Sequence, residues 1–146
     1  MRYVLLSIVL LNLMGFKAKE RGILTLHLEN IRSTKGNILV GIYKDQESWS
    51  KRTPFLEYTF SKTNMIEGRL TLTLTNMEPG LYGLALLDDA NGNEIVDMGM
   101  IFPKEGFGFS DYYHRSFLPP RFRDFTFIYP EKQNVNVKFR YLNKDS

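Results

Sequence analysis

The sequence predicts an all-β protein, folded as a single antiparallel β-sandwich of about seven strands. Apolar and polar residues alternate in several short segments, and Leu, Ile, Val, Thr, Phe and Tyr fill those segments. Gly, Pro and Asn cluster between them, as expected for turns. A chain of 146 residues with 43% hydrophobic and 24% charged residues is typical of one globular domain. An immunoglobulin-like sandwich is therefore the first expectation.

The N-terminus predicts a signal peptide over residues 1–18, which leaves residues 19–146 as the sandwich domain. A basic start at Arg2 precedes an apolar run from Val4 to Leu13. That run is shorter than the roughly 20 residues of a spanning helix. Two other interpretations stay open, a buried first strand and an uncleaved anchor. The signal peptide predicts export to the periplasm or the extracellular space, with no stable membrane insertion after cleavage.

Cysteine usage and charge exclude several classes of function. The chain has no cysteine, which excludes disulfides, thiolate nucleophiles and a lipid-attachment cysteine. Without Arg2 and Lys17 in the leader, 17 basic and 16 acidic residues give a net charge of +1. Lys and Arg are scattered singly, so we expect no nucleic-acid partner.

The first strands are predicted at Gly22–Asn30 and Ile38–Tyr43. Each places its apolar residues on one face with a period of two. The intervening segment Ser33–Asn37 carries Gly and Asn, which tolerate a positive φ. We therefore expect these two strands to form a hairpin.

A surface excursion and a clear strand follow. Asp45 is suited to cap a short helical turn, and Pro54 restarts extended chain over Phe55–Phe60. Leu and Thr alternate strictly over Leu70–Thr75, which predicts a strand with one buried face. Pro and Gly within Met77–Gly80 suit a type II turn.

Leu81–Leu87 is apolar on both faces, with small residues on one of them, and is predicted to be a central, well-covered strand. Residues 88–123 then form the longest irregular stretch, which we expect to be ordered because it is rich in aromatic residues. The last strands are predicted at Phe125–Tyr129 and Val135–Tyr141.

The stretch after the central strand resembles a calcium-binding turn. Counted from Asp89, oxygen ligands fall at positions 1, 3, 5, 7 and 9, the order found in EF-hand loops. The predicted calcium ligands are Asp89, Asn91, Asn93, the carbonyl of Ile95, and Asp97. Position 6 is Glu94 instead of Gly, and position 12 is not acidic, so Asp88 or Glu105 would have to supply a bidentate ligand. The alternative is a metal-free turn in which Asx side chains cap their own backbone around Asn91–Gly92.

An aromatic segment follows that loop. Gly106 and Gly108 resemble half of a phosphate-binding loop, but the pattern lacks the third Gly and a following helix. The rings either form a platform for sugars or peptides or cover the open end of the core. They are Phe102, Phe107, Phe109, Tyr112 and Tyr113.

Catalytic patterns are sparse. His27 and His114 are expected at the surface, and Ser110 lacks the strand-turn-helix setting of a nucleophile. A non-enzymatic binding or accessory domain, with a carbohydrate or a protein as ligand, is the leading hypothesis. A hydrolase acting on glycans through Asp88, Asp97 or Glu105 is one alternative. A structural or adhesion module with exposed Phe107, Tyr112 and Tyr113 is another.

The order of these motifs resembles an exported bacterial family, domain of unknown function 2141. The motifs are the strand Tyr82–Leu86, D-x-N-x-N-x-x-x-D from Asp89, G-x-x-x-P-x-E-G-x-G-F-S from Gly99, and P-x-F-x-D-F-x-F from Pro120. Family members usually carry His where this chain has Asp88, and Gly at Glu94. The resemblance implies a secreted or periplasmic, prealbumin-like β-sandwich with no assigned activity.

Overall fold

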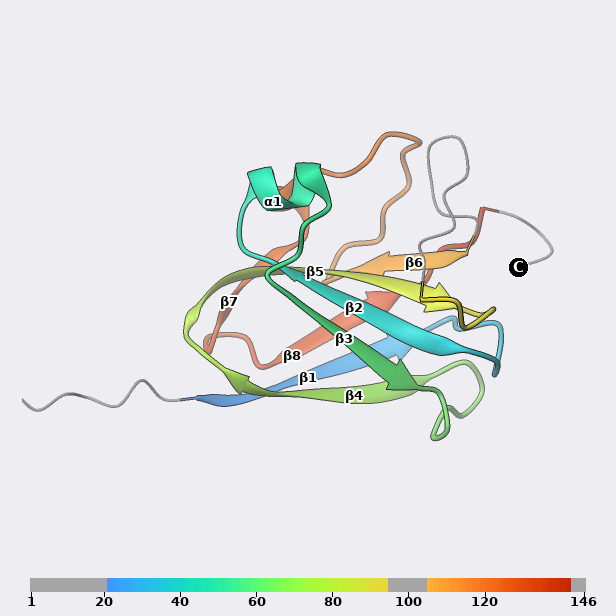
Figure 1. The fold of residues 1–146 in the computed structure, drawn as a ribbon. Coiled ribbons are helices and arrows are strands. Elements are labelled where there is room, and N and C mark those ends of the chain that lie inside the picture. Colours follow the sequence, from blue (N-terminus) through green and yellow to red (C-terminus); the bar gives the residue numbers. More distant parts are fainter. Residues whose placement is uncertain (1–20, 95–104, 143–146) are drawn as a thin grey trace, which may run out of the picture.

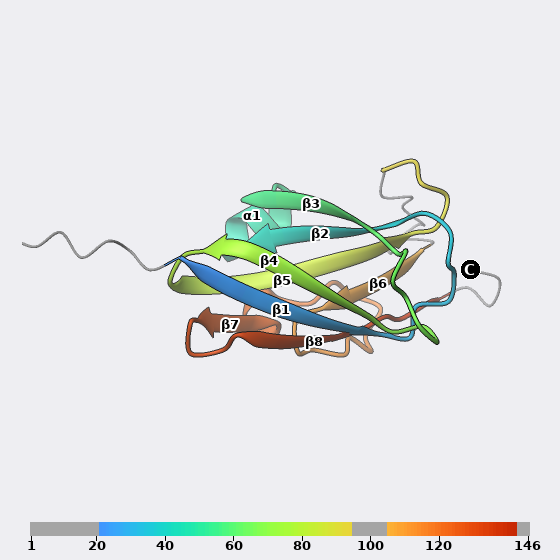
Figure 2. The same ribbon diagram turned by 90° about the horizontal axis from the view of Figure 1, so that it is seen from below.

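The computed structural model describes residues 21–94 and 105–142, which form two β-sheets and one short α-helix (Figure 1). One sheet has the order β4-β1-β8, and Figure 2 looks onto it. Its strands are β1 (Gly22–Glu29), β4 (Leu70–Met77) and β8 (Asn134–Lys138). The predicted all-β sandwich is confirmed. The predicted signal peptide, residues 1–18, lies outside the described residues.

The second sheet has the order β3-β2-β5-β6, and β7 also pairs with β5. Its strands are β2 (Asn37–Tyr43), β3 (Leu56–Ser61), β5 (Gly80–Asp89), β6 (Gly106–Phe109) and β7 (Thr126–Tyr129). β5 is the predicted central strand, with β2 along one edge and β6 and β7 along the other. Pairing is antiparallel except between β1 and β8, which run parallel.

The core lies between the two sheets and is built by the alternation seen in the sequence. Inward side chains of both sheets form one apolar cluster, in which β1, β2 and β4 each contribute three aliphatic residues. The cluster includes Leu24, Leu26, Leu28, Ile38, Val40, Ile42, Leu70, Leu72, Leu74, Tyr82, Leu84, Leu86, Val135 and Val137. Apolar residues at every second position of the strands thus bury one face of each sheet.

The expected hairpin between the first two strands is wrong. β1 and β2 belong to different sheets, and residues 30–36 cross from one sheet to the other. Asn30, at φ 63°, donates from its side chain to the Phe139 carbonyl at 2.8 Å. Gly36, at φ 71°, lies where a Cβ would come within 1.8 Å of the Asp89 carbonyl oxygen. The alternation alone could not distinguish pairing within a sheet from packing across the core, because both bury the same face.

The connection from β4 to β5 also crosses between sheets. The expected type II turn at Met77–Gly80 is absent, since the positive φ falls on Asn76, at 59°, and not on Gly80. The expected helical turn is α1 (Gln46–Lys51), and the Asp45 side chain caps it by accepting from Ser48 N at 2.7 Å. α1 and the chain after β6 lie on the outer side of the five-stranded sheet (Figure 1).

The stretch expected to be irregular contains β6, whose two glycines serve packing. A Cβ at Gly106 would lie 2.3 Å from the Tyr141 ring, and one at Gly108 would lie 2.5 Å from Val137. Phe107 and Arg140 exchange backbone hydrogen bonds of 3.0 and 2.8 Å. The Gly-x-Gly pattern therefore brings β6 against the end of the chain and joins the two sheets along that edge.

Candidate functional site

A buried ion pair lies at the end of the central strand. The side chains of Lys62 and Asp88 are 1% and 0% exposed, and the Lys62 ammonium donates to Asp88 Oδ1. It also donates to the Ser33 carbonyl at 3.1 Å and to the Lys35 carbonyl at 2.7 Å. An ammonium has three donors, and each of them has a partner here.

The second carboxylate oxygen of Asp88 accepts from the Tyr141 hydroxyl, which itself accepts from Arg32 N at 3.0 Å. Burial, together with the bond to Asp88, raises the pKa of Tyr141 well above its usual value. Both oxygens of Asp88 are thus engaged by protein groups. Of the other carboxylates in the hydrolase hypothesis, Glu105 is 8% exposed and Asp97 lies outside the described residues.

The loop after this pair is closed by the side chain of Asp89, which is fully buried. Its Oδ1 accepts from Gly92 N at 3.0 Å and Asn93 N at 3.2 Å, and its Oδ2 accepts from Glu94 N at 2.9 Å. Asn91 Oδ1 accepts from Asn93 N at 3.0 Å. Glu94 has a φ of 57°, so it adopts the left-handed conformation that usually favours Gly.

These bonds form the Asx-capped turn that the sequence offered as the alternative to a calcium loop. Of the predicted calcium ligands, Ile95 and Asp97 lie outside the described residues. In residues 21–94 and 105–142, no group of three His, Asp or Glu residues could hold a metal ion. Calcium binding by this loop stays a prediction.

A second cluster of aromatic side chains lies on the outer face of the five-stranded sheet. Trp49 on α1 is 6% exposed, and its ring meets those of Tyr43, Phe109 and Phe125 edge-on at centroid distances of 5.1, 5.7 and 5.1 Å. The Trp49 Nε1 donates to the Pro120 carbonyl at 2.7 Å. The helix and the chain after β6 are thereby held together above the sheet.

The predicted aromatic residues divide between this cluster and the surface. Phe107 and Phe109 are buried in it and Tyr112 packs against it, whereas Tyr113 is 41% exposed. Phe102 lies outside the described residues. Phe107 is therefore not the exposed residue that the adhesion hypothesis requires.

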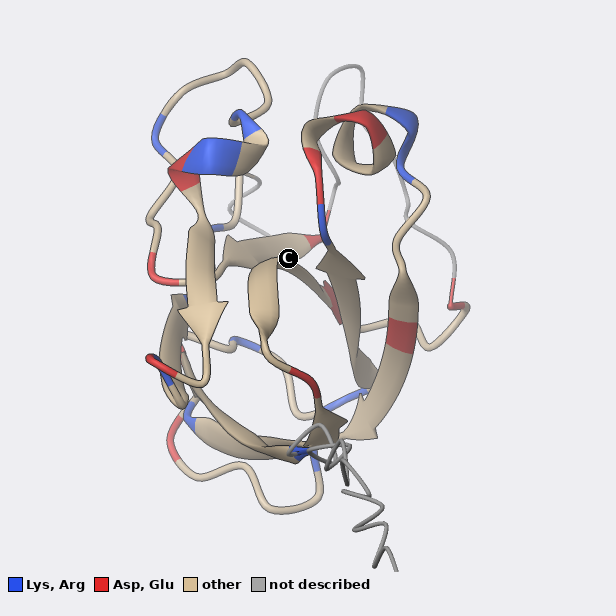
Figure 3. Cartoon of the chain, turned by 90° about the vertical axis from the view of Figure 1, so that its left-hand side faces the viewer, with Lys and Arg blue, Asp and Glu red and all other residues tan. Residues whose placement is uncertain are grey.

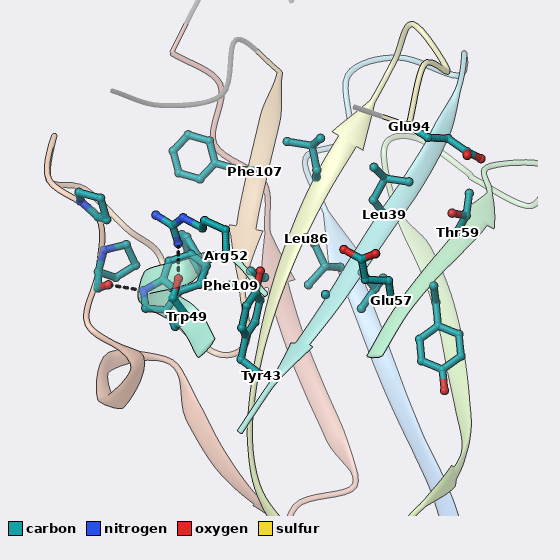
Figure 4. A pocket seen from close by; sticks show the side chains of 17 residues that line it. Leu39, Tyr43, Trp49, Arg52, Glu57, Thr59, Leu86, Glu94, Phe107 and Phe109 are labelled. Atoms are coloured by element: carbon teal, nitrogen blue, oxygen red, sulfur yellow. Dashed lines mark hydrogen bonds between the residues drawn. The ribbon is translucent and has the colours of Figure 1, made fainter. Parts of the chain in front are cut away.

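A pocket of about 480 Å³ opens beside the cluster, on the outer face of β2, β3 and β5 (Figure 4). Gly41 and Ala85, which pair across β2 and β5, are among its lining residues and leave room because they are small. The larger apolar lining residues include Leu39, Tyr43, Trp49, Leu87, Phe107, Phe109, Pro119 and Pro120. Its size falls in the range of sites for small ligands, about 300 to 1,000 Å³.

Charged groups of both signs line the pocket. The Arg52 guanidinium stacks over the Trp49 ring at 3.6 Å, and burial lowers its pKa against the opposing effect of Tyr43. Burial raises the pKa of the Tyr43 hydroxyl; Arg52 lowers it and Glu57 raises it. Glu57 and Glu94 are the two acidic residues that line the pocket. Elsewhere the acidic and basic residues are interspersed, largely along the connections (Figure 3).

The sequence did not identify Trp49, Arg52 or Glu57 as site residues. They come from three different places in the chain, namely α1, its C-terminal cap and β3. The sequence did contain one signal for this site: the single Trp of the chain, Trp49, lies between the predicted helix cap Asp45 and the basic Arg52. Only tertiary packing brings these positions to one pocket.

His114 is buried, contrary to the expectation of a surface position, with 3% of its surface exposed. Its Nε2 contacts the Leu118 carbonyl at 2.6 Å, and its Nδ1 contacts the Tyr112 hydroxyl at 3.4 Å. A neutral imidazole can form both hydrogen bonds, because Nε2 donates to the Leu118 carbonyl and Nδ1 accepts from the Tyr112 hydroxyl. Ser110 is also structural, because its hydroxyl accepts from Leu84 N at 2.9 Å and donates to the Phe125 carbonyl at 2.5 Å.

The fold and the pocket define a β-sandwich domain with a ligand-sized cavity on the outer face of one sheet. Residues 26–138 match a family described as "Uncharacterized protein conserved in bacteria (DUF2141)", and the chain belongs to that family. This confirms the resemblance seen in the sequence. No curated protein and no solved structure matches the chain. Among the described residues, no helix is long and apolar enough to cross a membrane.

Replacement of Lys62 is expected to destabilise the fold strongly. Lys62→Met leaves the Asp88 carboxylate buried without a counter-charge, which costs about 3 to 5 kcal/mol of unfolding free energy. Lys62→Met combined with Asp88→Leu should regain much of this loss, because it removes the stranded charge. Urea unfolding measures both variants, with Lys51→Met, at an exposed pair, as the control. If Lys62→Met were as stable as Lys51→Met, the buried pair would not have the stabilising role assigned to it.

Stability is expected to fall on acidification, in part through His114. Burial lowers the pKa of His114, aided by the charge of Arg140 and opposed by the Leu118 bond and Asp124. A depressed pKa in the folded state gives stability that is present above the unfolded value, about 6.5, and lost as the pH falls below it. Melting temperatures at neutral and mildly acidic pH should differ less for His114→Gln than for the wild type. His27→Gln is the control, and an unchanged pH dependence in His114→Gln would contradict this.

Proposed function

We propose that the protein is an exported, non-enzymatic binding domain that holds a small, largely apolar ligand in the pocket beside Trp49. The observation that carries the proposal is a cavity of about 480 Å³ with an aromatic and aliphatic lining and few polar groups. Ligand sites in proteins are commonly concave, mostly apolar and supplied with a few polar groups that orient the ligand. Export is supported by the signal-like segment at residues 1–18.

The walls of the pocket come from well-packed elements. The floor belongs to β2 and β5, which pair over Asn37–Tyr43 and Gly83–Asp89. Trp49 is held by three ring contacts and by the Pro120 carbonyl. A cavity formed before the ligand arrives lowers the ordering cost of binding.

Binding can be read out by Trp49 itself, because it is the only tryptophan of the chain. The neutral probe N-phenyl-1-naphthylamine is expected to quench Trp49 emission by energy transfer as it saturates the mature protein. Gly41→Leu should weaken this binding at least about tenfold by filling the floor. A Cβ at this position would lie 3.2 Å from the Tyr43 ring, so that ring has to shift by a few tenths of an ångström.

The control places the same side chain on the other sheet, as Thr71→Leu at an exposed position of β4. It should bind the probe as the wild type does. Failure of the wild type to bind the probe, or equal binding by Gly41→Leu, would count against the pocket as the ligand site. Circular dichroism of each variant establishes that the comparison is between folded proteins.

Calcium stabilisation of the loop from Asp89 is a separate proposal, supported by the spacing of its oxygen side chains. Millimolar calcium is expected to raise the melting temperature of the mature protein, and Asp89→Ala should abolish the rise. Asp89→Ala should also lower stability without calcium, since it removes the acceptor of three backbone amides. Asp45→Ala, a cap elsewhere, is the control. An unchanged melting temperature in calcium would rule the metal out.

A further inference from the structure

The pocket carries a basic and an acidic group whose contacts leave capacity for a ligand. The Arg52 guanidinium stacks on Trp49 and makes one hydrogen bond, of 3.4 Å, to the Trp49 carbonyl. A guanidinium has five N–H donors. In the part of the chain that the structure describes, the ion pairs include none formed by Arg52.

The placement of Arg52 is set by the backbone. Arg52 is the C-terminal cap of α1, with a φ of 56°, and donates its backbone N–H to the Trp49 carbonyl at 3.1 Å. A left-handed residue at this position is most often Gly, and any other residue there carries a conformational cost. The stacking on the Trp49 ring then gives the guanidinium one orientation at the pocket wall. Arg52 therefore combines a strained backbone conformation with a guanidinium charge that forms no ion pair with the described residues.

Glu57 supplies the opposite charge from β3. It pairs with Gly41 in the sheet, so its strand borders the open floor of the pocket. Arg52 and Glu57 act on the Tyr43 hydroxyl with opposite sign, which places both charges near the same ring. The ion pairs among the described residues do not join them to each other. Figure 4 shows both side chains at the pocket, on either side of Tyr43.

This arrangement discriminates between classes of ligand. A purely anionic ligand meets Arg52 but is repelled by Glu57 and Glu94. A purely cationic ligand meets the two carboxylates but is repelled by Arg52 and leaves that guanidinium without a partner. A neutral ligand leaves both charges without partners. A ligand with a carboxylate and an ammonium on an apolar body satisfies Arg52, Glu57 and the aromatic wall together.

Resting on the proposed binding function, we infer that the ligand is an amino acid or short peptide with apolar side chains, its carboxylate held by Arg52 and its ammonium by Glu57. Arg52 and Glu57 are both exposed to solvent. Because an ion pair at an exposed position contributes little, each charge should raise the affinity about two- to fivefold. The apolar body lies against Trp49 and Phe107.

Four forms of one dipeptide isolate the two charges. They are phenylalanyl-phenylalanine with free ends, with an acetylated N-terminus, with an amidated C-terminus, and with both ends blocked. None of them absorbs where tryptophan is excited selectively, so Trp49 emission and displacement of N-phenyl-1-naphthylamine report binding directly. The form with free ends should bind tightest, and each blocked end should weaken binding about two- to fivefold.

Protein variants assign each charge to its residue. Arg52→Gln should erase the effect of amidation and keep that of acetylation, whereas Glu57→Gln should do the reverse. Arg52→Lys, which retains a point charge, should keep part of the carboxylate effect. Glu47→Gln and Lys51→Gln on α1 are the charge controls, because neither residue lines the pocket.

Each outcome separates this inference from the proposed function. Equal affinity for the four dipeptides, or an effect of only one charge, overturns the zwitterionic ligand but leaves a pocket that binds N-phenyl-1-naphthylamine. Binding that is unchanged in both Arg52→Gln and Glu57→Gln also overturns it. Absence of binding by every dipeptide and by the probe overturns both.

Discussion

The buried pair of Lys62 and Asp88 is the contact on which the arrangement at one end of the sandwich depends. It joins the segment after β3 to the end of β5, and Lys62 also bonds the carbonyls of Ser33 and Lys35 in the crossover. Tyr141 brings the C-terminal segment to the same carboxylate. An isolated charge in this setting would be costly, so the buried pair favours the arrangement in which the four segments meet. The same point is where the loop closed by Asp89 begins.

From this end, β5 runs through the molecule and separates two apolar environments. Tyr82, Leu84 and Leu86 face the core, while Gly83 and Ala85 face the outer aromatic cluster. A Cβ at Gly83 would lie within 3 Å of the rings of Phe122 and Phe125, so the small residues allow the rings to close on the sheet. The pocket exists because the cluster covers only part of that face. One strand therefore supports both the stability of the sandwich and the candidate binding site.

Most predictions from local signals were confirmed, with the type II turn at Met77–Gly80 as an exception, whereas predictions that depend on distant segments were wrong. The cap at Asp45 and the alternation of Leu70–Thr75 each depend on neighbours along the chain, and both were confirmed. The hairpin of the first two strands was wrong, because a strand with one apolar face is equally satisfied by either sheet. Burial of His114 was missed because a loop histidine gains its partners, Leu118 and Tyr112, only when the loop folds back.

The sequence by itself determined the sandwich class, the central strand and the family, since periodicity and motif order are properties of the chain. For the loop at Asp89–Glu94 it offered two interpretations, a calcium loop and an Asx-capped turn. Tertiary structure alone decided that Asp88 is the partner of Lys62, 26 residues away, and that Trp49, Arg52 and Glu57 share one pocket. The physical reason is that charge pairing and cavity shape depend on which segments pack together. The sequence shows which aromatic and charged groups are present, and the packing of the two sheets determines which of them come into contact.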